Sequence, residues 1–279
     1  MKKILVAIDF SENARKAFLL AKYFAVKTGA ELCIMHATEP NIADLAIPIT
    51  QSSLPIYQQM EDSLKEQLGE YVVEAEIEGL KAIAYAEKGT VKDAAIGLAA
   101  QLGADMIVVG RTGKGGFFDK LIGSSATDIA LSAGCPVLIV PPQTDAYHPK
   151  NVVYATQLEY EEISILKQVN TLVTQLDGKL SFIKVSSLEQ PNIQPDGQFM
   201  DSISSELGID ASEINIQKGG GVLEGIEKFC EQRGADLLVV STRERSFIEQ
   251  FIINPSLTKK LVLDTKLPLL VYHLNSDDN

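Results

Sequence analysis

The feature that most constrains this 279-residue chain is an internal repeat, because five segments of its first half recur in the same order in its second half. The aligned pairs are 3–9 with 151–157, 30–37 with 178–185, 88–89 with 218–219, 103–109 with 234–240, and 135–140 with 267–272. The offset falls from 148 to about 131 after the second pair, which indicates a deletion of about 17 residues in the second copy. Five matches in one order predict two copies of one domain, at 1–144 and 145–279, each close to the commonest domain size.

Each copy alternates short apolar runs with amphipathic stretches. The apolar runs are continuous, which is typical of parallel strands buried on both faces. In the first copy we expect strands at 3–9, 31–37, 81–87, 105–110 and 136–141, and helices from a Ser11 cap to about Gly29 and at 56–78, 90–103 and 124–133. This order predicts an α/β fold, with an open five-stranded parallel sheet and helices on both faces in each copy. Such sheets bind ligands at the carboxyl ends of their strands, where the strand order reverses.

Composition and charge argue against several classes of protein. No apolar stretch reaches the roughly 20 residues that a membrane span needs, so no membrane association is expected. The net charge of −12 argues against nucleic acid as a partner, because neutralising phosphates requires clustered Lys and Arg. Cys33, Cys135 and Cys230 are odd in number and lie in apolar surroundings, which predicts reduced, buried thiols and a cytoplasmic protein. The histidines lack metal-ligand spacing, so no metal site is expected.

A glycine-rich segment follows the fourth expected strand of the first copy. Gly110 and Gly113 open it, and Gly123 precedes Ser124, Ser125 and the next expected helix. Glycine lets the backbone approach a ligand closely, and N–H groups at a helix N-terminus attract anions. The segment therefore indicates a phosphate cradle built mainly from backbone groups, and a glycine-rich turn with a serine helix cap is the alternative. The spacing fits neither a P-loop nor a Rossmann fingerprint.

The same segment carries a family resemblance. Its pattern Gly-x2-Gly-x9-Gly-[Ser/Thr] follows Ala-Asp-x-Ile-Val-Val-Gly and precedes Cys-Pro-Val-x-x-Val, which is similar to the universal stress protein family. The opening Lys-Ile-Leu-Val-Ala-Ile-Asp-Phe-Ser and the pair His36-Ala37 resemble that family too. The resemblance covers the whole chain as a tandem form, strongly in the first copy and weakly in the second. It implies a Rossmann-like sheet of the adenine nucleotide alpha hydrolase type and, in members with the motif, bound ATP or AMP.

The resemblance also implies roles for individual residues of the first copy. Asp9 is expected near the adenosine and the backbone of Ala37 at the adenine, while capping of the following helix is the alternative role for Asp9. The residues expected around the ribose and phosphates are Gly110, Gly113, Gly123, Ser124 and Ser125. Further residues expected to bind the nucleotide are Ala7, Ile8, Val109 and Arg111. The ligand is expected to be ATP, or AMP or ADP, with Mg²⁺ supplied alongside ATP.

The second copy departs from this pattern at every key position. The replacements are Gln157 for Asp9, Ser241 for Gly110, Glu244 for Gly113, and Asn254-Pro255 for Gly123-Ser124. A glutamate puts negative charge where a phosphate would lie, and a proline removes an N–H donor. We therefore predict that the second copy binds no ATP and is structural or partner-binding. Because this copy keeps the strand and helix pattern without those glycines, the glycines of the first copy are attributed to a ligand.

Two further segments bear on partners. The last expected strands, Val137–Val140 and Leu269–Tyr272, are apolar sheet edges that invite pairing. The family resemblance implies antiparallel pairing of such strands, so we expect the two copies to form a pseudo-dimer within the chain, with homodimerisation of whole chains left open. Residues 39–55 are either a cover over the nucleotide or an ordinary surface connection.

The sequence shows no constellation of residues for bond-breaking chemistry. It has no Gly-x-Ser-x-Gly elbow and no adenylating Ser-Gly-Gly-x-Asp-Ser loop. We therefore favour a stress-response regulatory protein that binds ATP over an enzyme, with weak ATP hydrolysis left open. The alternatives are a nucleotide-free interaction module, which recruits unknown protein partners, and a slow ATPase.

Overall fold

The computed structural model contains two sets of secondary-structure elements in the same order. It describes residues 1–39, 54–111, 124–145, 147–156, 162–186, 197, 200–201, 204–205, 208, 214–218, 221–243 and 257–274. The first half contains β1 (Lys3–Ala7), α1 (Glu12–Thr28), β2 (Glu31–Thr38), α3 (Leu54–Ile77), β3 (Ala82–Lys88), α4 (Val91–Leu102), β4 (Met106–Gly110), α5 (Ser124–Ser132) and β5 (Val137–Val140). The second half contains β6 (Asn151–Ala155), α6 (Glu162–Gln175), β7 (Lys179–Ser186), β8 (Ile214–Lys218), α8 (Val222–Arg233), β9 (Leu237–Arg243), α9 (Leu257–Asp264) and β10 (Leu269–Leu274).

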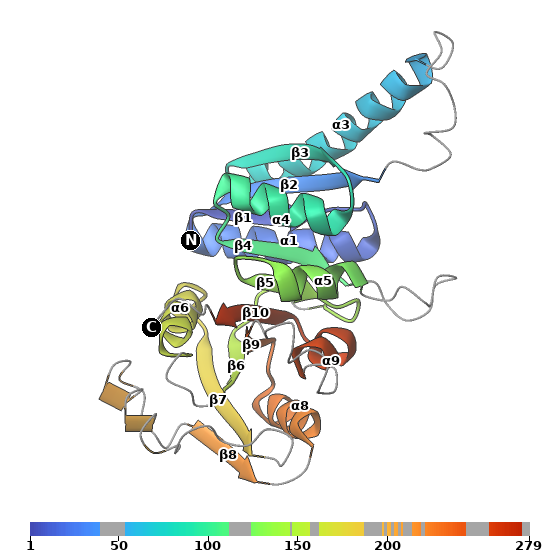
Figure 1. The fold of residues 1–279 in the computed structure, drawn as a ribbon. Coiled ribbons are helices and arrows are strands. Elements are labelled where there is room, and N and C mark those ends of the chain that lie inside the picture. The colour runs from blue at the N-terminus through green and yellow to red at the C-terminus, as the bar shows by residue number, and fades with distance from the viewer. Residues whose placement is uncertain are drawn as a thin grey trace.

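The strands of the described residues form a single ten-stranded sheet that runs through both halves. Their order is β3-β2-β1-β4-β5-β10-β9-β6-β7-β8 (Figure 1). Within each half the strands pair parallel, with β1 and its counterpart β6 in the middle. β5 and β10 pair antiparallel, with Leu138 opposite Leu270 and Ile139 opposite Leu269. The predicted α/β fold and the antiparallel pairing of the last strands are confirmed, while the boundary between 144 and 145 stays a prediction.

The ends of the helices follow from local sequence. Ser11 is extended at the N-cap of α1, and its Oγ accepts a hydrogen bond from the N–H of Ala14 at 3.1 Å. Gly29 follows the last turn at a φ of 71°, and its N–H donates to the carbonyl of Ala25. This left-handed backbone suits glycine, which has no Cβ to clash. Thr90 caps α4 in the same way as Ser11 caps α1. Capping residues read from the sequence therefore place these helices correctly.

Each face of the sheet carries a hydrophobic core that extends through both halves. On one face α1 and α3 share a core with α6, and Phe18, Phe24 and Tyr154 are fully buried there. On the other face α4 and α5 share a core with α8 and α9, where Ile129 and Val262 are fully buried. Burying such a side chain contributes roughly 1.5–3 kcal/mol. The two halves are therefore joined by continuous packing on both faces as well as by the sheet.

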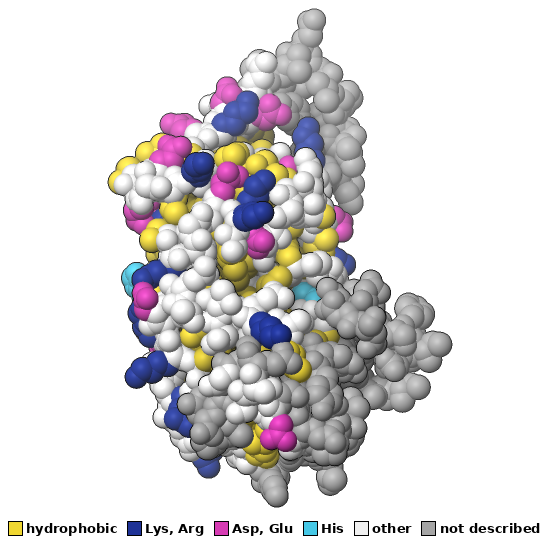
Figure 2. All heavy atoms as spheres, turned by 90° about the vertical axis from the view of Figure 1, so that its left-hand side faces the viewer, with side chains coloured by type: hydrophobic (Ala, Val, Ile, Leu, Met, Phe, Trp, Pro, Cys, Tyr) yellow, Lys and Arg dark blue, Asp and Glu magenta, His cyan; other side chains and the backbone are white. Residues whose placement is uncertain are grey.

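The surface of the described residues mixes charges of both signs. On the face shown in Figure 2, Lys and Arg side chains lie among Asp and Glu side chains over the first half. Lys22 contacts two carboxylates, with its Nζ 2.8 Å from Glu74 and 2.5 Å from Glu78.

In the described parts of the chain, no helix combines the length and the apolar character that a membrane crossing requires.

The cysteines give a direct test of burial. All three are free thiols, and Cys33 and Cys230 are buried while Cys135 is half-buried. Burial raises the pKa of Cys33 and Cys135 to about 11 and the pKa of Cys230 to about 12. Because only the thiolate attacks a disulfide reagent, the native chain is expected to react at pH 8 about a hundredfold more slowly than the chain unfolded in urea. The measurement is thiol release of a coloured aromatic disulfide, and equal rates in the two states would contradict the burial.

Candidate functional site

The strand order of the first half reverses between β1 and β4. These strands are parallel neighbours, with Ala7 opposite Val109. α1, which follows β1, packs on one face of the sheet, and α5, which follows β4, packs on the other (Figure 1). Gly110 ends β4 at this point, and Ala37 lies at the same sheet edge in β2, two residues beyond Met35, the partner of Ala7. Open α/β sheets bind ligands at this topological switch point.

The chain turns directly after β1. Asp9 is exposed, and its Oδ1 accepts a hydrogen bond from the N–H of Ser11 at 3.0 Å. β1 ends at Ala7 and not at residue 9, since Phe10 adopts a φ of 62° that no strand residue takes. Asp9 therefore does hold the start of α1, which was its alternative role. A carboxylate with one oxygen engaged by a backbone N–H keeps lone pairs that can accept from a ribose hydroxyl or an adenine amine.

Phe10 is a residue that sequence reasoning did not single out. Its left-handed backbone is unfavourable for a bulky side chain, and such strain is found preferentially at functional sites. Its ring lies against His36, with the ring centroids 4.8 Å apart. His36 in turn donates from Nδ1 to the carbonyl of Ile8 at 2.7 Å. These contacts fix the turn that carries Asp9, and nothing in the sequence pattern signals them.

Gly110 has a packing role that the sequence did not reveal. A Cβ at this position would lie 2.9 Å from the carbonyl oxygen of Asn13, in the first turn of α1. Asn13 Nδ2 also donates to the carbonyl oxygens of Arg111 and Val140, which holds α1 on the ends of β4 and β5. The close approach of α1 therefore requires glycine here. This corrects the interpretation that the glycines of the first copy are explained by a ligand alone.

Arg111 uses its side chain to contact the second half. The buried guanidinium donates to the carbonyl oxygens of Val262 at 2.5 Å and Thr265 at 2.7 Å, at the end of α9. Burial lowers the pKa of Arg111 and the nearby Asp264 raises it, and the group stays protonated because its ordinary pKa is far above neutrality. Its backbone N–H donates to the carbonyl of Val140 at 2.8 Å. The sequence predicts Arg111 as a nucleotide-binding residue, whereas the structure commits its guanidinium to the interface between the halves.

Several predicted residues lie outside the described part of the chain. They are Gly113 and Gly123 of the motif, Gln157, Glu244, Asn254 and Pro255 of the second half, and residues 40–53 of the expected cover. Ser124 begins α5, and Ser125 in its first turn is exposed. The predicted residues that the structure brings together at one sheet edge are Ala7, Ile8, Asp9, Ala37, Val109 and Gly110.

The second half contains a buried polar network at the matching strand ends. Glu162, the first residue of α6, is fully buried, and its Oε1 accepts hydrogen bonds from the hydroxyls of Tyr154 at 3.0 Å and Ser241 at 2.6 Å. Its Oε2 accepts from the hydroxyl of Thr156 at 2.7 Å. Burial raises the pKa of Tyr154 well above its usual value, so this hydroxyl remains a donor. The network links β6, β9 and α6.

This network has no counterpart in the first half, where the equivalent positions are small or apolar. The equivalent pairs are Val6 with Tyr154, Ile8 with Thr156, Ala14 with Glu162, and Gly110 with Ser241. The strand register supports the alignment, since Val6 pairs with Val108 as Tyr154 pairs with Val239. The two halves therefore differ beneath the strand ends as well as in the glycine motif. Sequence reasoning missed Glu162, because an acidic residue in the first turn of a helix usually faces solvent.

The comparison with known proteins identifies the family. The sequence model of the universal stress protein family matches residues 1–141. The chain belongs to the universal stress protein family. A universal stress protein of Thermus aquaticus, encoded in the 3′ region of a QAH/OAS sulfhydrylase, is 32% identical over 143 residues, which is 50% of this chain and 98% of that protein. Universal stress protein A homolog 1 of Coxiella burnetii is also 32% identical over 143 residues, 50% of this chain and 95% of its own length.

Solved structures match the tandem fold over nearly the whole chain. A universal stress protein from Archaeoglobus fulgidus has a TM-score of 0.74 at 19% identity, and the match covers 98% of both chains. A putative universal stress protein from Pseudomonas aeruginosa has a TM-score of 0.65 at 18% identity and covers 98% of this chain and 93% of that one. These likenesses show the fold of the whole chain.

Proposed function

We propose that the first half binds an adenine nucleotide, ATP or else AMP or ADP, at the carboxyl ends of β1, β2 and β4, and that the second half is its structural partner. The observation that carries the proposal is the reversal of strand order between β1 and β4, directly before the predicted glycine motif, in a universal stress protein. Nucleotide occupancy then regulates partners in a cytoplasmic stress response. Mg²⁺ is supplied alongside ATP, and chemistry at the phosphates is weak at most.

Each proposed contact follows from the placement of a residue. The exposed carboxylate of Asp9, held at the end of β1, accepts from a ribose hydroxyl or the adenine amine. The backbone of Ala37, at the same edge in β2, lies beside the adenine. The N–H groups at the start of α5, together with the exposed Ser125, attract the phosphates, because a helix N-terminus carries partial positive charge. Gly113 and Gly123 allow the backbone between β4 and α5 to approach them.

The second half is proposed to bind no adenine nucleotide. At the matching strand ends it has a buried carboxylate, Glu162, hydrogen-bonded to Ser241, where the first half has Ala14 and Gly110. Together with the loss of the glycine motif, this supports a structural role for the second half.

Calorimetric titration of the full chain with ATP tests the proposal. The wild type is expected to bind one ATP, and Gly113→Glu, which copies the second half, is expected to abolish binding. Asp9→Ala is expected to weaken binding about tenfold, since it removes one hydrogen bond to a charged group. The matched control is Ser11→Ala, which removes the N-cap of α1 and lowers stability by about 1 kcal/mol but touches no proposed ligand contact.

Three outcomes would count against the proposal. A wild type that binds no adenine nucleotide would favour the nucleotide-free interaction module. Equal weakening by Asp9→Ala and Ser11→Ala would show that Asp9 acts only through the helix start. Rapid phosphate release that Asp9→Ala abolishes would move the assignment to an ATPase.

A further inference from the structure

The last turn of α9 is capped from the other half of the molecule. The final carbonyl groups of a helix have no partner within the helix and carry partial negative charge. Arg111 supplies a buried guanidinium to two carbonyls there, those of Val262 and Thr265. A charge-assisted hydrogen bond of this kind is roughly twice as strong as a neutral one. Arg111 immediately follows Gly110, the last residue of β4. The end of the strand that leads into the glycine motif is thus attached to the second half.

The helix on the other side of the motif is attached to the second half as well. His273, in β10, donates from Nε2 to the carbonyl of Ala130 in α5 at 2.8 Å. α5 and α9 also pack together in the core on this face of the sheet. Both described segments that flank residues 112–123, β4 with Arg111 on one side and α5 on the other, are therefore held by α9 and β10.

These contacts do not simply follow from the pseudo-symmetry of the two halves. The repeat aligns Arg111 with Thr242 and His273 with Pro141. Threonine has no guanidinium and proline has no side-chain donor, so the equivalent bonds cannot form at the positions related by the repeat. Among the described residues, the attachment of the motif-bearing end of β4 to the second half by these two side chains therefore has no repeat-related counterpart. A contact required merely to hold two like halves together would be expected on both sides.

We propose that Arg111 is a positioning residue for the nucleotide site and that the second half, through the end of α9, regulates the affinity of that site. The inference rests on the proposed function. A ligand held between the end of β4 and the start of α5 favours one arrangement of those two segments. The bonds of Arg111 and Ala130 hold the same two segments against α9 and β10. Binding of the ligand and formation of these contacts between the halves are therefore energetically coupled. Such coupling is reciprocal, so binding of the nucleotide must also stabilise the end of α9.

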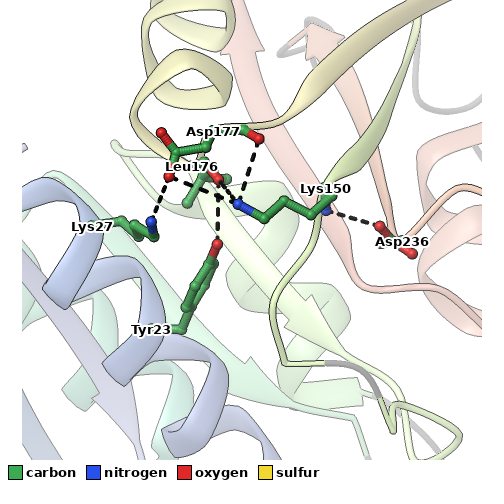
Figure 3. Close-up of polar contacts among 6 residues, drawn as sticks. All are labelled: Tyr23, Lys27, Lys150, Leu176, Asp177 and Asp236. Atoms are coloured by element: carbon green, nitrogen blue, oxygen red, sulfur yellow. Dashed lines mark hydrogen bonds and ion pairs between the residues drawn. The ribbon is translucent and has the colours of Figure 1, made fainter.

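The opposite face of the sheet provides a matched control. There α1 meets α6 in a second set of contacts between the halves, shown in Figure 3. Lys27 Nζ lies 2.6 Å from Asp177 Oδ2, and the hydroxyl of Tyr23 donates to the carbonyl of Leu176 at 3.3 Å. Lys27 lies in the last turn of α1 and Asp177 follows α6, and the hydrogen bonds described for these two side chains include none to β4 or α5. Removing Lys27 is therefore expected to disturb the interface without removing a hydrogen bond to the segments that flank the motif.

The experiment compares the full-length wild type with Arg111→Met, Arg111→Lys and Lys27→Ala. Methionine keeps the volume of the buried side chain and removes its donors, and lysine restores the charge without the planar fork. Calorimetry gives the affinity for ATP, and hydrogen exchange of α9 and β10 is followed with and without saturating ATP. In the wild type ATP is expected to slow exchange at the end of α9. Arg111→Met is expected to weaken ATP binding about tenfold and to lose the effect on α9 even at saturation. Arg111→Lys should recover part of both, and Lys27→Ala should retain both.

The outcomes separate this inference from the proposed function. If the wild type binds ATP but exchange in α9 and β10 does not change, the inference is overturned whether or not Arg111→Met folds. If Arg111→Met melts earlier but binds ATP like the wild type, Arg111 is a structural contact and the inference is overturned too. Equal weakening by Lys27→Ala would show that any damage to the interface suffices, which also overturns it. A wild type that binds no adenine nucleotide overturns the proposed function and this inference together.

Discussion

Glu162→Ala is expected to lower the free energy of unfolding by about 3–5 kcal/mol. The substitution removes a carboxylate that is fully buried and leaves the hydroxyls of Tyr154, Thr156 and Ser241 without this acceptor. A buried hydroxyl that loses its partner is destabilising by about 1–3 kcal/mol, because its hydrogen bond to water in the unfolded chain is not replaced. Urea unfolding of the full chain, followed by circular dichroism, measures the change.

Two controls test whether the network is the cause. Glu12→Ala removes the acidic residue in the first turn of α1, the counterpart of α6, where the side chain is 90% exposed, and should change stability by less than about 1 kcal/mol. A fourfold variant, Glu162→Ala with Tyr154→Phe, Thr156→Val and Ser241→Ala, makes the site apolar as it is in the first half. It is expected to regain most of the loss, since removing both partners of a buried hydrogen bond is far less destabilising than removing one. A loss under 1 kcal/mol for Glu162→Ala alone would refute the structural importance of the network.

The features that could be read from the sequence are those set by local pattern. Continuous apolar runs predicted the parallel strands, and the residues Ser11, Thr90 and Gly29 predicted where α1 and α4 begin or end. The repeat predicted that the two halves share one topology, and apolar last strands predicted their pairing across the junction. Each signal depends on neighbours within one element or on the comparison of two copies, so no knowledge of distant contacts is needed.

The residues whose roles were missed depend on partners far away in the chain. Arg111 is predicted to bind the nucleotide because it stands in a glycine motif, yet its guanidinium donates to carbonyls 151 and 154 residues later. Glu162 reads as a solvent-facing acidic residue at a helix start, yet Ser241, 79 residues later, donates to it. Phe10 takes a left-handed backbone that no pattern of apolar residues signals. Periodicity and capping rules carry no information about such contacts, which arise only when the chain packs into its tertiary structure.

Gly110→Ala is expected to lower the free energy of unfolding by about 1–3 kcal/mol. The added Cβ would lie 2.9 Å from the carbonyl oxygen of Asn13 and 3.2 Å from the nitrogen of Ala14, and both are backbone atoms that cannot turn aside. α1 must therefore move away from β4, which strains the hydrogen bonds of Asn13 to Arg111 and Val140. Thermal or urea unfolding of the full chain measures the loss.

Gly97→Ala is the matched control, because it makes the same chemical change at a glycine where a Cβ would meet nothing within 4 Å. In the middle of α4 this substitution is expected to raise stability by about 0.5–1 kcal/mol, so the two variants should change stability in opposite directions. If Gly110→Ala also leaves stability unchanged or higher, the approach of α1 does not require glycine and a ligand remains the better explanation. Ser241 occupies the equivalent position in the second half, where its hydroxyl bonds to Glu162. The second half therefore has serine in place of glycine here because the start of α6 packs differently. The argument that glycine serves a ligand then depends on Gly113 and Gly123.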